Sequence, residues 1–220
     1  MNKVKYKLKR SIQMKYEWRK REKSLYMTTG IQMLKIPKMK FITIAGEGNP
    51  NTAQFTHQIE ALYGLSYAIR MKYKTGYYED PFIYTVYPLE GVWTSKEKPI
   101  DGVVDKEGLV YQIMIRQPDT FNAERFDEIV EETYAKKNNP FIKVAQLIEY
   151  EEGHVIQGLH IGSFDTEKET FDQMEQLLAI NNIKKTVIME KYQHREIYLS
   201  DARRVLPEKQ KTLLRYKIIE

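Results

Sequence analysis

The spacing of hydrophobic residues changes along the chain from a two-residue to a 3.6-residue period, and it does so twice in the same order. In the first half, a short strand-like segment is followed by a glycine-rich turn, a long amphipathic segment and two more strand-like segments. The turn is Gly46-Glu47-Gly48-Asn49-Pro50, whose residues are typical of loops. The predicted elements are a strand over 40–45, a helix over 52–73 and strands over 82–89 and 109–115.

The second half returns to this order after an extra helix predicted over 122–137. Its predicted elements are a strand over 154–162, a helix over 167–180 buried through Phe171, Met174 and Leu178, and strands over 186–199 and 212–219. We expect an α+β fold of duplicated strand-helix-strand-strand units that form a pseudo-symmetric antiparallel sheet, with helices on one face and a central ligand groove. The expected organisation is a basic N-terminal extension over 1–35 and one domain over 36–220, with a first half (36–120), a linking helix (121–140) and a second half (141–220).

Charge is unevenly distributed along the chain. Residues 1–40 hold 13 Lys and Arg against 2 Asp and Glu, whereas the other 180 residues hold 22 against 28. The basic segment is expected to be a solvated tail, with phosphate contact by its lysines and arginines as the less favoured alternative. The mildly acidic body disfavours nucleic acid and suits small neutral or cationic ligands. The basic residues of this tail are Lys3, Lys5, Lys7, Lys9, Arg10, Arg19, Lys20, Arg21 and Lys23.

The absence of cysteine excludes disulfides, thiolate zinc sites and thiol nucleophiles. The chain has no apolar run of about 18 residues and no signal-peptide apolar core, so we expect a cytoplasmic protein without membrane contact. Met14 is a second candidate start of translation.

The strand-like segment 194–201 has two chemically different faces. Ile197 and Leu199 point to one side, while His194, Glu196 and Tyr198 point to the other. Taken alone, the polar face suits either solvent or a ligand cleft. The same parity places the first-half aromatics Tyr87 and Trp93 on one face, provided that Gly91 introduces no bulge, and Tyr111 follows in the neighbouring strand. Trp93 and Tyr111, each taken alone, are equally consistent with ordinary core packing.

Most motifs of catalysis are missing from the chain. The segment Gly46-Glu47-Gly48 lacks the third glycine and the Lys-Ser/Thr pair of a phosphate loop. The histidines His57, His154, His160 and His194 lack metal-ligand spacing, so neither a metal nor another cofactor is expected. The acidic run Glu149, Glu151 and Glu152 is expected to be a solvated hairpin. An enzyme built from these residues must therefore use general acid–base chemistry.

Several blocks together resemble the GyrI-like small-molecule-binding family, and within it the free-standing branch that hydrolyses cyclopropanoid DNA-alkylating compounds. The blocks are Gly46-x-Gly48-Asn49-Pro50-Asn51, Leu65-Ser66-Tyr67, Tyr87-Pro88-Leu89-Glu90-Gly91-Val92-Trp93, Met114-Ile115-Arg116-Gln117-Pro118, Gln157-Gly158-Leu159-His160-Ile161-Gly162, Glu196-Ile197-Tyr198-Leu199-Ser200-Asp201, and Arg203-Arg204 through Lys211-Thr212-Leu213-Leu214-Arg215. The resemblance implies a central groove in which Glu196 contacts the ligand and Trp93 lines the wall. The chain departs from its relatives at Thr94, where they often have a second aromatic residue, and at Arg195, which is expected to face away from the groove.

The first functional hypothesis is hydrolysis of a spirocyclopropane cytotoxin by water addition, for self-protection. Glu196 is expected to be the base, Tyr111 or Tyr198 the proton donor, and Trp93, Tyr198, Tyr87 and His160 the substrate-binding residues. The alternative is sequestration or sensing of an amphipathic cation without chemistry. The expected partner is a small aromatic or amphipathic ligand. A transcription regulator is disfavoured because the basic segment is too short and polar for a helix-turn-helix bundle. Gyrase inhibition and the oligomeric state stay open.

Overall fold

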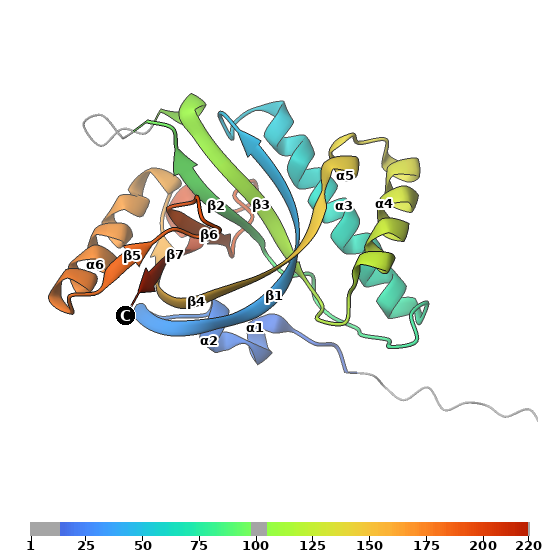
Figure 1. The fold of residues 1–220 in the computed structure, drawn as a ribbon, viewed down its shortest axis with the longest axis horizontal. Helices are drawn as coiled ribbons and strands as arrows, with labels where there is room; N and C mark the ends of the chain where they lie inside the picture. The colour runs from blue at the N-terminus through green and yellow to red at the C-terminus, as the bar shows by residue number, and fades with distance from the viewer. Residues whose placement is uncertain (1–13, 98–104, 220) are drawn as a thin grey trace, which may run out of the picture.

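The computed structural model describes residues 14–97 and 105–219, and its elements follow the duplicated order (Figure 1). The strands are β1 (Ile31–Glu47), β2 (Leu89–Ser95), β3 (Leu109–Gln117), β4 (Gln146–Ile161), β5 (Lys184–Thr186), β6 (His194–Tyr198) and β7 (Lys211–Ile219). The helices are α1 (Trp18–Arg21), α2 (Lys23–Tyr26), α3 (Ala53–Thr75), α4 (Ala123–Lys137), α5 (Phe141–Val144) and α6 (Glu167–Ile180), with short 3-10 helices η1 (Lys106–Gly108), η2 (Phe164–Thr166) and η3 (Pro207–Lys209). The unit β1-α3-β2-β3 is therefore repeated as β4-α6-β6-β7, and α4 and α5 link the two units.

The described strands form one antiparallel sheet in the order β4-β1-β3-β2-β6-β7-β5. Because β7 also pairs with β4, six of these strands close into a barrel-like ring. Strand β5 lies outside the ring on the other side of β7, since Lys217 pairs with Val155 of β4 and with Thr186 of β5. The two units join at the long, curved β1–β4 pair and at the shorter β2–β6 pair (Figure 1).

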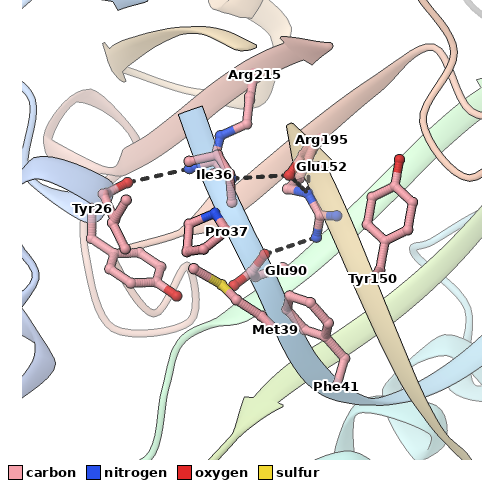
Figure 2. A pocket seen from close by; sticks show the side chains of 11 residues that line it. Tyr26, Ile36, Pro37, Met39, Phe41, Glu90, Tyr150, Glu152, Arg195 and Arg215 are labelled. Atoms are coloured by element: carbon pink, nitrogen blue, oxygen red, sulfur yellow. Dashed lines mark hydrogen bonds and ion pairs between the residues drawn. The ribbon is translucent and has the colours of Figure 1, made fainter. Parts of the chain in front are cut away.

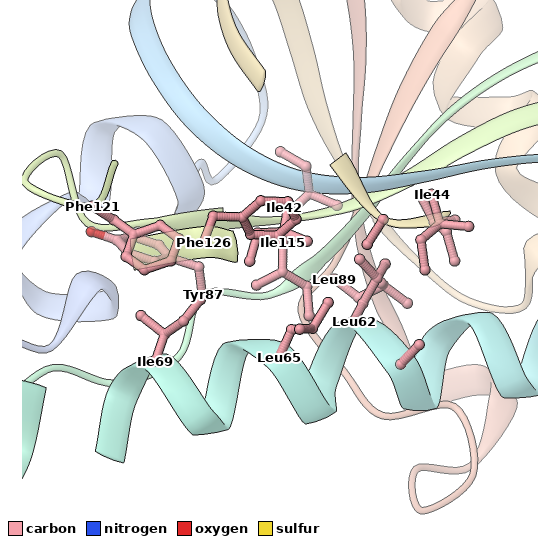
Figure 3. Packing of buried hydrophobic residues seen from close by; sticks show 14 of the residues in the cluster. Ile42, Ile44, Leu62, Leu65, Ile69, Tyr87, Leu89, Ile115, Phe121 and Phe126 are labelled. Carbon is pink, nitrogen blue, oxygen red and sulfur yellow. The ribbon is translucent and has the colours of Figure 1, made fainter. Parts of the chain in front are cut away.

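Helices α3 and α6 cover the outer face of this ring. Strand register places Ile44, Ile113, Gly91 and Glu196 on that face, and the first two pack under α3. The residues buried between α3 and the sheet include Ile42, Ile44, Leu62, Leu65, Ile69 and Ile115 (Figure 3). Helix α6 lies close against β4 because Gly158 has no side chain, as a Cβ there would lie 3.0 Å from a Thr170 methyl. The predicted α+β fold with a duplicated antiparallel sheet is confirmed.

The inner face of the ring holds buried charged side chains (Figure 2). Arg195 of β6 forms ion pairs with Glu90 of β2 at 2.9 Å and with Glu152 of β4 at 3.0 Å. Arg215 of β7 lies 3.1 Å from the same Glu152 carboxylate. Two guanidinium groups thus balance two carboxylates, which matters because an unpaired buried ion costs several kcal/mol. A cavity of about 10 Å³, room for about one water molecule, lies beside them.

The charges of this inner network act differently on its two carboxylates. Burial opposes ionisation of Glu152, but Arg195 and Arg215 outweigh it and hold the pKa of Glu152 below its ordinary value. Burial raises the pKa of Glu90, and the guanidinium groups offset this only in part. The prediction of a solvated acidic hairpin is therefore wrong for Glu152, which is 2% exposed. Arg195 points away from Glu196, as expected from strand parity.

The predicted strand over 82–89 is wrong for most of its length. Over residues 82–88, the only strand pairing within the described chain is an isolated bridge between Tyr84 and Tyr16, and β2 begins at Leu89. The preceding residue, Pro88, has no N–H to donate to a neighbouring strand. Aromatic side chains of this segment pack into the core from an irregular backbone, which explains why their alternation resembled a strand.

The predicted strand over 186–199 is interrupted. Met189 and Glu190 have φ angles of 49° and 60°, a left-handed conformation that reverses the chain between β5 and β6. An isolated bridge between Ile188 and Tyr192 closes this turn. Strand β2, in contrast, runs through Gly91 without a bulge, so Leu89, Gly91 and Trp93 share one face.

Part of the predicted extension over 1–35 belongs to the folded body, which corrects the expected boundary. Trp18 is 2% exposed and lies in the largest hydrophobic cluster. Glu22, between α1 and α2, forms an ion pair with Arg116 of β3 and accepts a hydrogen bond from the Tyr87 hydroxyl at 2.9 Å. The many lysines and arginines of this segment masked the few side chains that anchor it.

Lys3, Lys5, Lys7, Lys9 and Arg10, the first residues of the predicted tail, lie outside the described residues. Over the ranges that are described, none of the helices combines the length and apolar character needed to cross a membrane.

Candidate functional site

Glu196 lies on β6, where the two units of the sheet meet. The register pairs it with Gly91 of β2 on one side and Leu214 of β7 on the other, so its side chain points to the outer face. Ile197 points the opposite way and is fully buried. The predicted alternation of this strand is confirmed. The Glu196 side chain is only 13% exposed, so this face is not an ordinary solvated surface.

Neighbouring side chains hold both oxygens of the Glu196 carboxylate. The Tyr198 hydroxyl donates to Oε2 at 2.8 Å, and Nε2 of His194 lies 2.9 Å from Oε1. The Trp93 indole N–H in turn donates to the Tyr198 hydroxyl at 3.2 Å. Burial and the negative charge of Glu196 raise the pKa of Tyr198 well above its ordinary value. The phenol therefore keeps its proton, which is committed to the carboxylate.

Two glycines leave space for the Trp93 and Tyr111 rings, which form the aromatic floor of the site beside Glu196. A Cβ on Gly91 would lie 2.5 Å from Nε1 of Trp93, and a Cβ on Gly46 would lie 2.6 Å from the Tyr111 ring. The two rings pack with centroids 5.0 Å apart, and the Tyr111 hydroxyl donates to Oε1 of Gln58 at 2.9 Å. Trp93 is 5% exposed and Tyr111 is 1% exposed. Both rings thus form a floor, and the proton of Tyr111 is already engaged.

More aromatic rings surround this floor. Phe55 of α3 packs on Trp93 with centroids 5.9 Å apart, and Phe164 of η2 meets Tyr198 edge-on at the same separation. Phe171 of α6 meets the His194 ring at 4.9 Å. We call the whole group the Glu196 cluster; its members are Phe55, Trp93, Phe164, Phe171, His194, Glu196 and Tyr198. Phe164 is 46% exposed, so the cluster reaches the surface. An anionic centre among aromatic faces suits flat or cationic ligands.

The structure adds Glu167, which sequence reasoning missed. It is the first residue of α6 and is 6% exposed. Burial and the nearby charge of Glu196 raise its pKa to about 10, against a hydrogen bond from Thr212 that lowers it. The sequence position of Glu167 could have indicated its burial, because Glu167, Met174 and Leu178 fall on one face of the predicted helix. A carboxyl group within an otherwise buried stripe is a candidate functional residue.

Two predicted site residues lie apart from the Glu196 cluster in their described contacts. Tyr87 stacks near Trp18 and donates its hydroxyl proton to Glu22. His160 of β4 is buried under the start of α6, with Nδ1 3.0 Å from Oγ1 of Thr170 and Nε2 3.0 Å from the Ser163 carbonyl oxygen. These hydrogen bonds hold the start of α6 in place, and Glu167 is the first residue of that helix.

Within residues 14–97 and 105–219, no group of three His, Cys, Asp or Glu side chains is arranged to hold a metal ion. The chemistry that the site offers is one carboxylate with two hydrogen-bond partners, one buried carboxyl group and a set of aromatic faces.

Solved structures from Listeria innocua share this fold over nearly the whole chain. An uncharacterized conserved protein from this organism is 30% identical with a TM-score of 0.84, over 93% of this chain and 100% of that chain. A hydrolase from the same organism is 28% identical with a TM-score of 0.81, over 93% and 100% of the two chains. Another hydrolase structure is 28% identical with a TM-score of 0.83, over 94% and 100%.

Comparison with curated protein sequences gave no match. Comparison with protein families matched residues 29–218 to the GyrI-like small molecule binding domain. Because this match spans most of the chain and the fold agrees with it, the protein belongs to the GyrI-like family of small-molecule-binding domains.

Proposed function

We propose that the protein binds a small aromatic or amphipathic molecule at the Glu196 cluster and hydrolyses a cyclopropanoid cytotoxin there by adding water. The observation behind this proposal is the Glu196 carboxylate, held by Tyr198 and His194 beside the Trp93 indole. Similarity to Listeria hydrolases at 28% identity supports a hydrolytic role. The proposal includes self-protection as the biological role and a cytoplasmic location.

The proposed reaction needs a base and a surface for a flat ligand. Glu196 orients a water molecule and takes its proton, while the water oxygen bonds to the cyclopropane carbon. The ring C–C bond breaks, and its electron pair passes into the dienone, whose oxygen becomes a phenolate and then a phenol. Trp93 and Tyr198 hold the ligand, and Tyr111 supports the Trp93 ring from behind. No cofactor is needed for this balance of atoms and electrons.

The test is incubation of the protein with a spirocyclopropane DNA-alkylating compound, followed by mass spectrometry. The wild type should convert the compound to a product heavier by one water. Glu196→Gln should lose most turnover, about 100-fold or more, yet still quench Trp fluorescence on binding. Glu208→Gln, a change at an exposed glutamate in η3, is the matched control and should behave as the wild type.

Binding without turnover by the wild type would instead support sequestration or sensing of the ligand. Equal turnover by wild type and Glu196→Gln would refute the assignment of Glu196 as the base.

A further inference from the structure

Glu167 occupies a position that α6 otherwise gives to buried, mostly apolar side chains. The buried residues of this helix are Glu167, Thr170, Met174 and Leu178, which share one face. Glu169, another acidic residue in the same helical turn, is exposed, so acidic residues of this turn are not all buried. Burying a carboxyl group is costly unless it is neutral or paired. The placement of Glu167 therefore calls for an explanation beyond helix formation.

The groups that face Glu167 are polar or negative. Glu196 and Tyr198 face it from β6, Thr212 from β7 and Asp165 from η2. On its own helix, Thr170 is held by the ring of His160 from β4. Burial, Glu196 and Asp165 favour the neutral acid, whereas the Thr212 hydroxyl and the N-terminus of α6 favour the anion, and burial is the largest of these influences. The pKa of Glu167 is raised to about 10, which favours its protonated form beside Glu196 at neutral pH.

Glu167 also has an unengaged oxygen. Its Oε1 is buried and has no hydrogen-bond partner within the described part of the protein. A neutral carboxyl group has one O–H to donate, and burying that donor without an acceptor is unfavourable. The two tyrosines expected as donors differ from it, because Tyr198 already donates to Glu196 and Tyr111 to Gln58.

We propose that Glu167 is the second acid–base residue of the site, which donates a proton to the ligand oxygen while Glu196 accepts one from water. This inference rests on the proposed hydrolysis. In the reaction, the dienone oxygen takes the proton of Glu167 as the cyclopropane C–C bond breaks, and Glu196 takes a proton from the attacking water. The pair holds one proton before and after this step. Transfer of that proton from Glu196 back to Glu167 restores the starting state.

The experiment compares Glu167→Gln with Glu169→Gln, the exposed neighbour in the same helical turn. Glu167→Gln should lower kcat at least tenfold, as expected for loss of a general acid, while ligand affinity changes less than about threefold. The wild-type kcat should fall at alkaline pH as Glu167 loses its proton, and Glu167→Gln should lack this fall. Glu167→Asp, which keeps a carboxyl group, should recover part of the activity and the alkaline fall. Glu169→Gln should match the wild type.

The outcomes separate this inference from the proposed function. Wild-type turnover with an unchanged kcat and pH profile in Glu167→Gln overturns the donor role alone. An equal loss in Glu167→Gln and Glu167→Asp, without any difference in pH profile, also overturns it, because a packing role would explain that result. Absence of wild-type turnover overturns the proposed hydrolysis and the donor role together.

Discussion

Replacing Glu152 by Gln tests whether the inner charge network stabilises the fold. The Glu152 carboxylate is paired with Arg195 and Arg215, and all three side chains are at most 4% exposed. After the change, Glu90 is the one carboxylate left in this network, where it pairs with Arg195, and Arg215 keeps only neutral acceptors on Gln157 and Leu25. Removing one partner from a buried ion pair costs about 3–5 kcal/mol. For a protein of this size, that loss corresponds to a fall in Tm of about 6–20 °C.

The assay is urea unfolding of Glu152→Gln alongside Glu151→Gln at pH 7. Glu151 is the adjacent residue, its side chain is 48% exposed, and its contact with Lys35 is 4.0 Å long, so its loss should cost less than about 1 kcal/mol. The pKa of Glu152 is lowered from 4.5, so its contribution is present above that pH and is lost as the pH falls through the folded-state pKa. The difference between wild type and Glu152→Gln should therefore shrink under acid conditions. A loss below about 1 kcal/mol at pH 7 would refute the reasoning.

Three further changes test other parts of the structure. Trp18→Ala should cost about 3–5 kcal/mol in urea unfolding, and a loss near zero would show that the N-terminal helices are not part of the core. Gly91→Ala should displace the Trp93 indole and weaken ligand binding at least about tenfold by fluorescence, whereas Gly30→Ala, whose Cβ meets nothing within 4 Å, should have no effect. The pKa of Glu167 is raised from 4.5 to about 10, so wild-type stability should fall as the pH rises through this window. Glu167→Gln should be more stable than the wild type at pH 9 by differential scanning fluorimetry, and equal pH slopes would contradict the assignment.

The regular elements with a clear period were predictable from the chain. The buried residues of α3 keep helical spacing from Gln58 to Tyr73, and a strand followed by a glycine-rich turn precedes the helix. The errors fell where backbone conformation depends on distant contacts. The aromatic segment 82–88 alternates like a strand, but its rings pack without ladder partners over most of its length. Similarly, Trp18 is a single large apolar residue among basic ones, and local composition says nothing of the core that receives it.

The site was predictable in part for the same reason. Strand parity alone placed Glu196, His194 and Tyr198 on one face, because side chains of a strand alternate strictly. Parity could not show that the Tyr198 hydroxyl donates to Glu196. It also could not show that Tyr87 contacts Glu22, since that contact joins the irregular segment before β2 to the N-terminal segment, 65 residues away.

By itself, the sequence determined the two strand-helix-strand-strand units and the side of β6 on which Glu196 lies, because both follow from local periodicity. Only the tertiary structure decided that the β4–β7 pair closes the sheet and that Glu152 is buried with Arg195 and Arg215. Only it brought Glu167 beside Glu196. The physical reason is that burial and charge pairing are properties of segments that meet in space. The desolvation that raises the pKa of Glu167 comes from elements far from it in the chain.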